Sequence, residues 1–156
     1  MTIFTNSNYG NSPVTLRQPD FQQIDQEDKI NDTNLEWKSW RERAKSDNSI
    51  YYFSVYSNDN LVGEIFLHDI NEETKEALVG YRIFDSGMRG KGIGTEALLL
   101  LQRFVKENTD LKTLIIITAE NNLPSIKMAE RCGFTKLGTS RENKKDIVLS
   151  WKRNLP

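Results

Sequence analysis

Hydrophobic and polar positions alternate in short blocks along the first half of the chain. Between Phe21 and Lys45 the apolar residues are widely spaced among charged ones, which predicts two short amphipathic helices. Val14 to Leu16 is typical of a first short strand. Ile50 to Tyr56 and Leu61 to Leu67 are aromatic and β-branched runs joined by a polar turn, which predicts a β-hairpin. A second polar turn leads into a third antiparallel strand from Ala77 to Phe84.

The pattern changes after Gly87. From Thr95 to Asn108 apolar residues recur every three to four positions, which predicts a helix with one buried face. Leu114 to Ile117 is a continuous apolar run, as expected of a strand covered on both faces. A helix between two strands forms a βαβ unit, so this strand should pair in parallel with Ala77 to Phe84.

A second helix is predicted from Leu123 to Cys132. Asn122 is suited to cap it, and Pro124 fits its first turn because the N–H that proline lacks would be unpaired there anyway. Gly133 is typical of a helix end. Two strands, near residues 135–140 and 146–151, close the chain.

Together these elements predict one α+β (mixed α/β) domain over residues 1–156. We expect a twisted, mixed, mainly antiparallel sheet of six to seven strands flanked by helices. Residues 1–12 are rich in Asn, Ser and Thr and show no periodicity, so we expect a loose leader or a short edge element. No internal repeat and no linker rich in Pro or Gly divides the sequence.

Composition and charge narrow the class of ligand. Hydrophobic residues make up 37% of the chain and charged residues 28%, which predicts a folded protein. A net charge of -1 and a pI near 5.9 disfavour a nucleic-acid surface. Cys132 is the only cysteine, which excludes an internal disulfide and a multi-cysteine zinc site and favours a cytoplasmic location. We expect no metal. No stretch approaches the roughly 18 apolar residues of a membrane span, so no membrane partner is expected.

Three glycines alternate with other residues in the turn Arg89–Gly94, directly before the predicted helix. Backbone N–H groups at a helix start, unshielded by side chains, favour a diphosphate, and Arg89 and Lys91 add positive charge. The alternative is a tight turn without a ligand. Two other phosphate motifs do not fit, because Gly92 follows Lys91 where a P-loop needs Ser or Thr, and Thr95 stands where the dinucleotide fingerprint needs glycine.

The run Arg89-Gly90-Lys91-Gly92-Ile93-Gly94 resembles the Arg/Gln-x-x-Gly-x-Gly/Ala signature of the GNAT superfamily of acyl-CoA N-acyltransferases. The longer pattern is similar to the branch that contains the ribosomal-protein N-terminal acetyltransferases; it comprises Gly80–Phe84, Gly90–Ala97, Asn122-x-x-Ser125 and Gly133-Phe134. This resemblance covers residues 61–151. It implies a sheet in which the parallel strands, 77–84 and 114–118, splay apart around acetyl-CoA.

The resemblance also implies a role for each matching residue. The pantetheine of acetyl-CoA should pair with the backbone of Ile83 and Phe84 and contact Asn122, while the diphosphate meets the N–H groups of the glycine turn and helix start. The cofactor-binding residues expected in this way are Ile83, Phe84, Arg89, Gly90, Lys91, Gly92, Ile93, Gly94, Thr95 and Asn122. Ser125 matches a family serine near the leaving sulfur and is expected to be catalytic.

The general base is expected to be an acidic residue or the histidine. Glu142 lies after Gly133-Phe134, where the ribosomal branch carries a base, whereas Glu64 and His68 lie on a strand next to the expected cleft. Many family members carry a tyrosine that acts as a general acid, and Ala129 occupies its place here. General acid catalysis by a tyrosine at this position is therefore not expected. Cys132 should pack rather than act as a nucleophile, which favours direct transfer.

These expectations describe an enzyme that moves an acetyl group from acetyl-CoA to a primary amine, either a small molecule or a protein N-terminus. We expect a monomer or homodimer. Two alternatives stay open. One is an acyl-CoA-binding regulatory module without catalysis, because Leu78 and Ala129 stand where family members carry acidic or basic groups; the other is a nucleotide-binding domain. Trp37, Trp40 and the pair Tyr51-Tyr52 belong either to the acceptor pocket or to the core.

Overall fold

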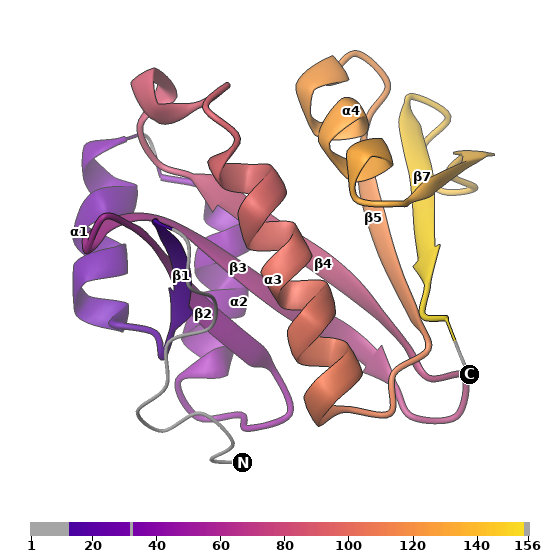
Figure 1. The fold of residues 1–156 in the computed structure, drawn as a ribbon, viewed down its shortest axis with the longest axis horizontal. Coiled ribbons are helices and arrows are strands. Elements are labelled where there is room, and N and C mark those ends of the chain that lie inside the picture. Colours follow the sequence, from indigo (N-terminus) through magenta and orange to yellow (C-terminus); the bar gives the residue numbers. More distant parts are fainter. Residues whose placement is uncertain (1–12, 32, 155–156) are drawn as a thin grey trace.

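The computed structural model describes residues 13–31 and 33–154, so the predicted leader at residues 1–12 lies outside the described part. A seven-stranded sheet has the order β1-β2-β3-β4-β5-β7-β6 (Figure 1). Only β4 and β5 are parallel neighbours within it, which confirms the predicted mixed, mainly antiparallel sheet. The strands are β1 Val14–Arg17, β2 Tyr51–Ser57, β3 Asn60–Asn71, β4 Glu76–Ile83, β5 Thr113–Ala119, β6 Thr135–Thr139 and β7 Asp146–Lys152.

Helices lie on both faces of the sheet, with α3 and α4 on one face and α1 and α2 on the other (Figure 1). Their bounds are α1 Phe21–Ile30, α2 Leu35–Ala44, α3 Ile93–Asn108 and α4 Leu123–Arg131. Both predicted helices between residues 21 and 45 are confirmed, and α3 begins two residues before its predicted start. Among the residues described, no helix is long and apolar enough to span a membrane.

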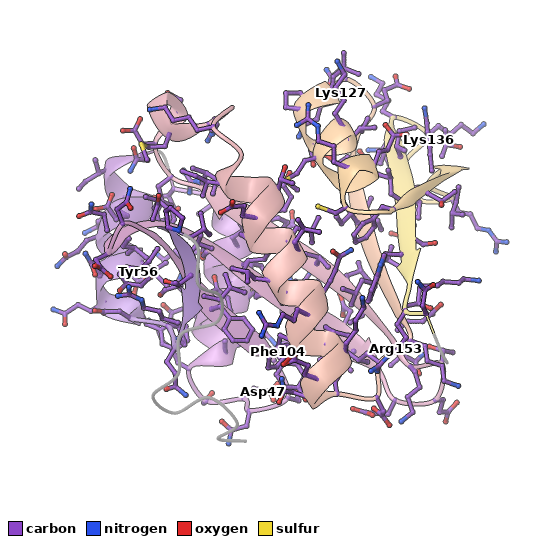
Figure 2. The ribbon with its side chains drawn as sticks, in the orientation of Figure 1. Asp47, Tyr56, Phe104, Lys127, Lys136 and Arg153 are labelled. Carbon is purple, nitrogen blue, oxygen red and sulfur yellow. The ribbon has the colours of Figure 1, made fainter. Side chains whose placement is uncertain are left out.

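Two hydrophobic clusters hold the helices to the sheet. The larger lies beneath α3 and α4, where Leu98, Leu101 and Phe104 of α3 are completely buried. Figure 2 shows Phe104 beside α3. Burial of each such side chain contributes about 1.5–3 kcal/mol relative to exposure. The smaller cluster joins Ile24 of α1 to Phe66 of β3. The apolar face that predicted α3 from sequence is therefore the face that anchors it.

The two ends of α3 have different surroundings. Arg153 follows β7 and binds the C-terminal end: its Nη1 donates to the carbonyls of Thr109 at 2.9 Å and Leu111 at 3.0 Å, and its Nη2 donates to that of Lys106 at 2.6 Å (Figure 2). A cation there balances the partial negative charge of the helix end. At the other end Gly92 is the N-cap residue and makes no side-chain cap. The positive end of α3 is therefore open.

Strands β4 and β5 pair over three residues only. Residues 76–78 of β4 match residues 113–115 of β5, although β4 continues to Ile83 and β5 to Ala119. The two strands diverge beyond this point, as the resemblance implied. The edge of β4 toward Ile83 consequently has no strand beside it on that side in the described sheet.

The prediction that Leu114 to Ile117 is covered on both faces is wrong. Leu114 and Ile116 are buried in the larger cluster, whereas Ile117 is 44% exposed. The reason is the placement of α1 and α2, which pack against β2 and β3 rather than β5. A continuous apolar run thus forms a strand with one covered face.

Candidate active site

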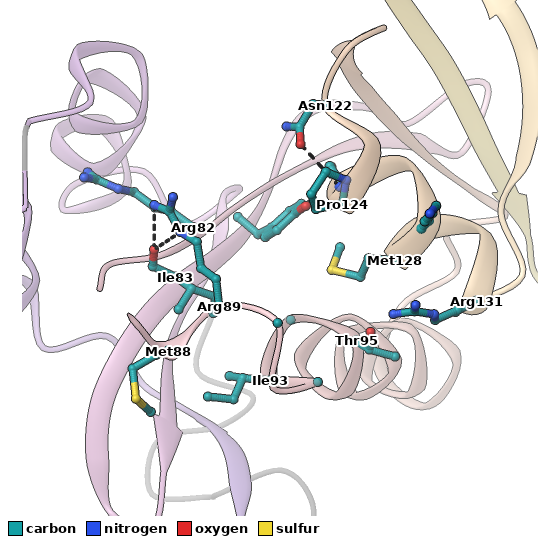
Figure 3. A pocket seen from close by; sticks show the side chains of 16 residues that line it. Arg82, Ile83, Met88, Arg89, Ile93, Thr95, Asn122, Pro124, Met128 and Arg131 are labelled. Atoms are coloured by element: carbon teal, nitrogen blue, oxygen red, sulfur yellow. Dashed lines mark hydrogen bonds between the residues drawn. The ribbon is translucent and has the colours of Figure 1, made fainter. Parts of the chain in front are cut away.

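A cavity of about 580 Å³ opens where β4 and β5 diverge (Figure 3). Its walls come from the end of β4, from the glycine turn with the start of α3, and from α4 with its N-cap residue. The cations Arg82, Arg89, Lys127 and Arg131 line it, and its described lining includes no carboxylate. Arg82 is paired with the buried Asp28, which leaves three cations to act on a ligand. The cavity is therefore suited to an anion.

The turn before α3 takes its shape from Gly90 and Gly92. Their φ angles are 78° and 81°, a left-handed conformation that residues with a Cβ rarely adopt. A Cβ added at either position meets nothing within 4 Å, so the turn is open to the cavity side. The first backbone bond of α3 runs from Glu96 N–H to the Gly92 carbonyl. The N–H groups of residues 93–95 precede this bond and have no carbonyl partner within the helix.

Side chains bind two carbonyl groups at the open edge of β4. The Trp37 indole N–H of α2 donates to the Tyr81 carbonyl at 3.2 Å. Arg89 donates to the Ile83 carbonyl through Nε at 3.3 Å and Nη2 at 3.2 Å (Figure 3). In an unbroken sheet, a neighbouring strand would bind carbonyls at such an edge. The edge is therefore ready to pair with an extended ligand once the Arg89 side chain moves.

A short hydrogen bond crosses the cavity from β4 to α4. The Tyr81 hydroxyl lies 2.6 Å from Ser125 Oγ, and both residues line the cavity. Ser125 is in the first turn of α4, where its N–H donates to Asn122 Oδ1 at 3.3 Å. Asn122 is thus the predicted N-cap, and its Nδ2 also donates to Thr118 Oγ1 at 3.1 Å. Two hydroxyl groups and one amide meet at this end of the cavity.

The structure brings the predicted cofactor-binding residues together in this cavity, except Phe84 and Lys91. Lys91 is exposed on the turn. The Phe84 ring is buried in the smaller cluster, and its N–H donates to the Val62 carbonyl at 2.9 Å, so this N–H is already used. Close packing also favours glycine at position 94, because an added Cβ would lie 2.8 Å from Met128 Sδ.

Glu142, the expected general base, is exposed in the loop between β6 and β7. Its backbone N–H donates to Ser140 Oγ at 3.3 Å. Glu142 is outside the described lining of the cavity. Ser125 lines the cavity, whereas Glu142 is exposed to solvent.

Glu64, the first alternative base, is completely buried in an ion network between the helices α1 and α2 and the sheet. Arg41 Nη2 donates to both carboxylate oxygens, at 3.0 Å and 2.9 Å, and Arg41 Nη1 also contacts Asp28 at 3.3 Å. Tyr52 donates a further hydrogen bond to Glu64. Burial raises the pKa of Glu64, while Arg41 and Tyr52 act to lower it. The carboxylate is thus committed to structural partners.

His68, the second alternative base, lies on the face of the sheet that α1 and α2 cover. Its ring packs against Trp40 in a tilted arrangement, with the centroids 4.4 Å apart, and lies 6.5 Å from the Trp37 ring. Its Nδ1 is 3.0 Å from Asp69. Burial lowers the pKa of His68, against the opposite effect of Asp69. His68 is 6% exposed, so it is neither a surface residue nor part of the cavity lining. Trp37 and Trp40 likewise surround this histidine rather than line the cavity.

Cys132 is buried at the end of α4, as predicted for a packing residue. Its thiol donates to the Thr95 carbonyl at 3.6 Å. Burial raises the pKa of Cys132 to about 11, so the thiolate form is scarce at neutral pH. A nucleophilic role is therefore disfavoured.

Several lining residues were not singled out from the sequence. Lys127 and Arg131 lie four positions apart on α4, a spacing that places both on one side of a helix and could have revealed them. Tyr81 was recognised only as part of a motif. Its contact with Ser125 joins residues 44 positions apart, and no local pattern encodes such a pair.

An electropositive cavity with an open helix end at one side and a hydroxyl pair at the other can bind a long phosphorylated ligand and act on its far end. Many solved structures share this fold. MccE, a microcin C7 self-immunity acetyltransferase solved with acetyl-CoA and AMP, has a TM-score of 0.71 at 23% identity, covering 92% of this chain and 94% of that one. The ribosomal-protein-S5-alanine acetyltransferase of Vibrio fischeri has a TM-score of 0.77 at 18% identity, with 94% and 97% covered.

Sequence comparison gives the family. The Probable N-acetyltransferase YjcK of Bacillus subtilis is 32% identical over 109 residues, which are 68% of this chain and 59% of that protein. The matched stretch thus spans less than two thirds of this curated relative. The model of the Acetyltransferase (GNAT) domain matches residues 11–135. The chain therefore belongs to the GNAT acetyltransferase family.

Proposed function

We propose that this protein transfers an acetyl group from acetyl-CoA directly to a primary amine. The observation that carries the proposal is the cavity itself. It joins the open positive end of α3 to the Ser125 hydroxyl, and cations without carboxylates line it among the described residues. Its fold is shared with MccE, which was solved with acetyl-CoA.

In this proposal the diphosphate of acetyl-CoA binds the N–H groups of residues 92–95. These groups lack carbonyl partners within α3, and the helix dipole favours negative charge beside them. Lys127 and Arg131 line the cavity from α4, which packs beside the start of α3, and attract the remaining phosphate charge. The two walls thus neutralise a ligand that carries several negative charges.

The pantetheine arm then runs along the open edge of β4 toward Ser125. At this edge the Trp37 side chain binds the Tyr81 carbonyl and the Arg89 side chain binds the Ile83 carbonyl. A bound pantetheine replaces Arg89 at this carbonyl, and the released guanidinium is then free to contact phosphate. Asn122 contacts the arm from the α4 side. The Phe84 N–H, already bonded to Val62, has no part in this arrangement.

The reaction requires stabilisation of the departing thiolate. The amine nitrogen attacks the carbonyl carbon of the thioester, and the C–S bond breaks with its electron pair on sulfur. Ser125 lies in the cavity at the start of α4, where its hydroxyl and the positive helix end both favour a developing thiolate. Cys132, whose thiol stays protonated, supports direct transfer over an acetyl-cysteine intermediate.

Glu142 remains the proposed general base, because Glu64 is bound to Arg41 and His68 is enclosed by Trp40. The loop between β6 and β7 would bring Glu142 toward the amine when both substrates are bound. Glu142→Gln should lower kcat with little change in acetyl-CoA affinity. The matched control is Glu73→Gln, in the turn between β3 and β4, and its kcat should equal that of wild type. Equal kcat in wild type and Glu142→Gln would remove Glu142 from the mechanism.

Thiol release from acetyl-CoA in the presence of an amine panel tests the function itself. The panel should contain a peptide with a free N-terminus, a polyamine and small-molecule amines, since both protein and small-molecule acceptors fit the proposal. We expect amine-dependent release of CoA with at least one class. Tight binding of acetyl-CoA without turnover across the whole panel would instead support a regulatory binding module.

A further inference from the structure

We propose that Tyr81 is a positioning residue for acetyl transfer: its hydroxyl donates to Ser125 Oγ and so directs the Ser125 proton at the leaving sulfur. This inference rests on the proposed function, since it concerns the same cavity and the same serine. It adds a residue on β4, across the cavity from α4.

The geometry fixes both partners. The Tyr81 hydroxyl and Ser125 Oγ are 2.6 Å apart, the usual distance of a strong O–H···O bond. The Tyr81 ring packs against the larger hydrophobic cluster, and its backbone carbonyl accepts from Trp37 Nε1. Ser125 is 6% exposed and is held through its N–H by Asn122. The backbone on each side of the Tyr81–Ser125 hydrogen bond is therefore anchored by a contact of its own.

The direction of the bond follows from what each hydroxyl can do. Burial raises the pKa of Tyr81, so the phenol keeps its proton and acts as a donor. When Tyr81 donates to Ser125 Oγ, the Ser125 proton is free to point into the cavity. A chain of two hydrogen bonds that ends on a developing anion is cooperative, because each bond polarises the next. Tyr81 thereby strengthens Ser125 as a donor without touching the substrate.

No proton leaves Tyr81 in this step. The amine loses one proton as the C–N bond forms, and the thiolate gains one after the C–S bond breaks, so the reaction balances with both hydroxyls unchanged. Tyr81 only orients the donor that meets the negative charge on sulfur. Its contribution should therefore appear in kcat and should depend on the Ser125 hydroxyl.

Steady-state kinetics of Tyr81→Phe, Ser125→Ala and the double variant test the inference. Tyr81→Phe removes one oxygen and keeps the ring, so we expect kcat to fall about 3- to 10-fold with KM for acetyl-CoA nearly unchanged. In the Ser125→Ala background the same change should have little further effect. The control is Tyr51→Phe, because Tyr51 is also partly buried but lines a separate hollow with Glu72 and Asp110. Its kcat should equal that of wild type.

Equal kcat in wild type and Tyr81→Phe would overturn the inference, as would an equal fold loss from Tyr81→Phe with and without the Ser125 hydroxyl. A purely structural bond between β4 and α4 would raise KM and lower the melting temperature instead. Either result leaves the acetyltransferase function standing, because wild-type turnover shows that function separately.

A binding measurement gives the same test without turnover. Calorimetry at an alkaline pH at which the CoA thiol is ionised compares CoA with desulfo-CoA, which lacks the sulfur. Wild type should prefer CoA, and this preference should shrink in Tyr81→Phe and in Ser125→Ala. An unchanged preference in Tyr81→Phe contradicts the inference. Absence of binding for both ligands in wild type would instead refute the proposed function, and the inference with it.

Discussion

Replacement of Gly92 by aspartate tests the diphosphate site by charge alone. Gly92 is the N-cap residue of α3 with φ 81°, and an added Cβ meets nothing within 4 Å. Aspartate and asparagine tolerate this left-handed conformation better than other residues with a side chain, and both are favoured at helix N-caps. Gly92→Asn is therefore the matched neutral control, and neither variant should lose much folding stability.

The size of the effect follows from Coulomb's law. One unit charge about 6 Å from another, at an effective dielectric constant of about 20, costs about 3 kcal/mol. Acetyl-CoA affinity in Gly92→Asp should therefore be about 100-fold below that of Gly92→Asn. The difference should shrink in high salt, because ions screen exposed charges.

Isothermal titration calorimetry at low and high salt measures this difference, with thermal unfolding as a check on folding. Equal affinity in Gly92→Asp and wild type would refute the placement of the diphosphate at α3. Equally poor binding by Gly92→Asn would show that side-chain volume, rather than charge, is what the site excludes.

Three further predictions concern the ion network, the buried histidine and the cationic wall. Arg41→Met should lower the free energy of unfolding by about 3–5 kcal/mol, because it leaves the Glu64 carboxylate buried without its cation. In urea unfolding, the double variant Arg41→Met/Glu64→Gln should recover part of this loss. No recovery would contradict this cause. The pKa of His68 is lowered in the folded chain, so the unfolded chain binds the proton more readily. The free energy of unfolding should therefore be highest above the unfolded pKa of about 6.5 and should fall as the pH drops below it. The fall should be less steep in His68→Gln. An equal pH slope in both proteins would exclude this origin. Lys127→Ala should weaken acetyl-CoA binding about 2- to 5-fold at low salt in calorimetry, whereas Lys136→Ala on β6, outside the described lining, should leave it unchanged.

Local signals predicted most of the fold. The apolar periodicity of residues 95–108 gave α3, and Asn122 with Pro124 gave the start of α4, because helix faces and caps are encoded within a few residues. The β5 strand was misjudged for the opposite reason. Its four apolar residues do not reveal that α1 and α2 cover other strands and leave Ile117 exposed.

The parts of the candidate site that are contiguous in sequence were also predictable, whereas contacts between distant residues were not. The glycine turn is contiguous in sequence, so its phosphate chemistry could be inferred from residues 89–94 alone. Tyr81 and Ser125 meet only because β4 and β5 diverge and α4 packs across the gap. Glu64 looked like a free acid in sequence, yet its partner Arg41 lies 23 positions away on α2. Burial and pairing over such separations decide which polar residues are available for chemistry.

A crystal structure with acetyl-CoA would test the proposed placement of the cofactor. We expect diphosphate oxygens within hydrogen-bond distance of the N–H groups of residues 92–95, Arg89 released from the Ile83 carbonyl, and the thioester sulfur beside Ser125 Oγ. A diphosphate bound away from the start of α3, or a sulfur beyond the reach of Ser125, would contradict it.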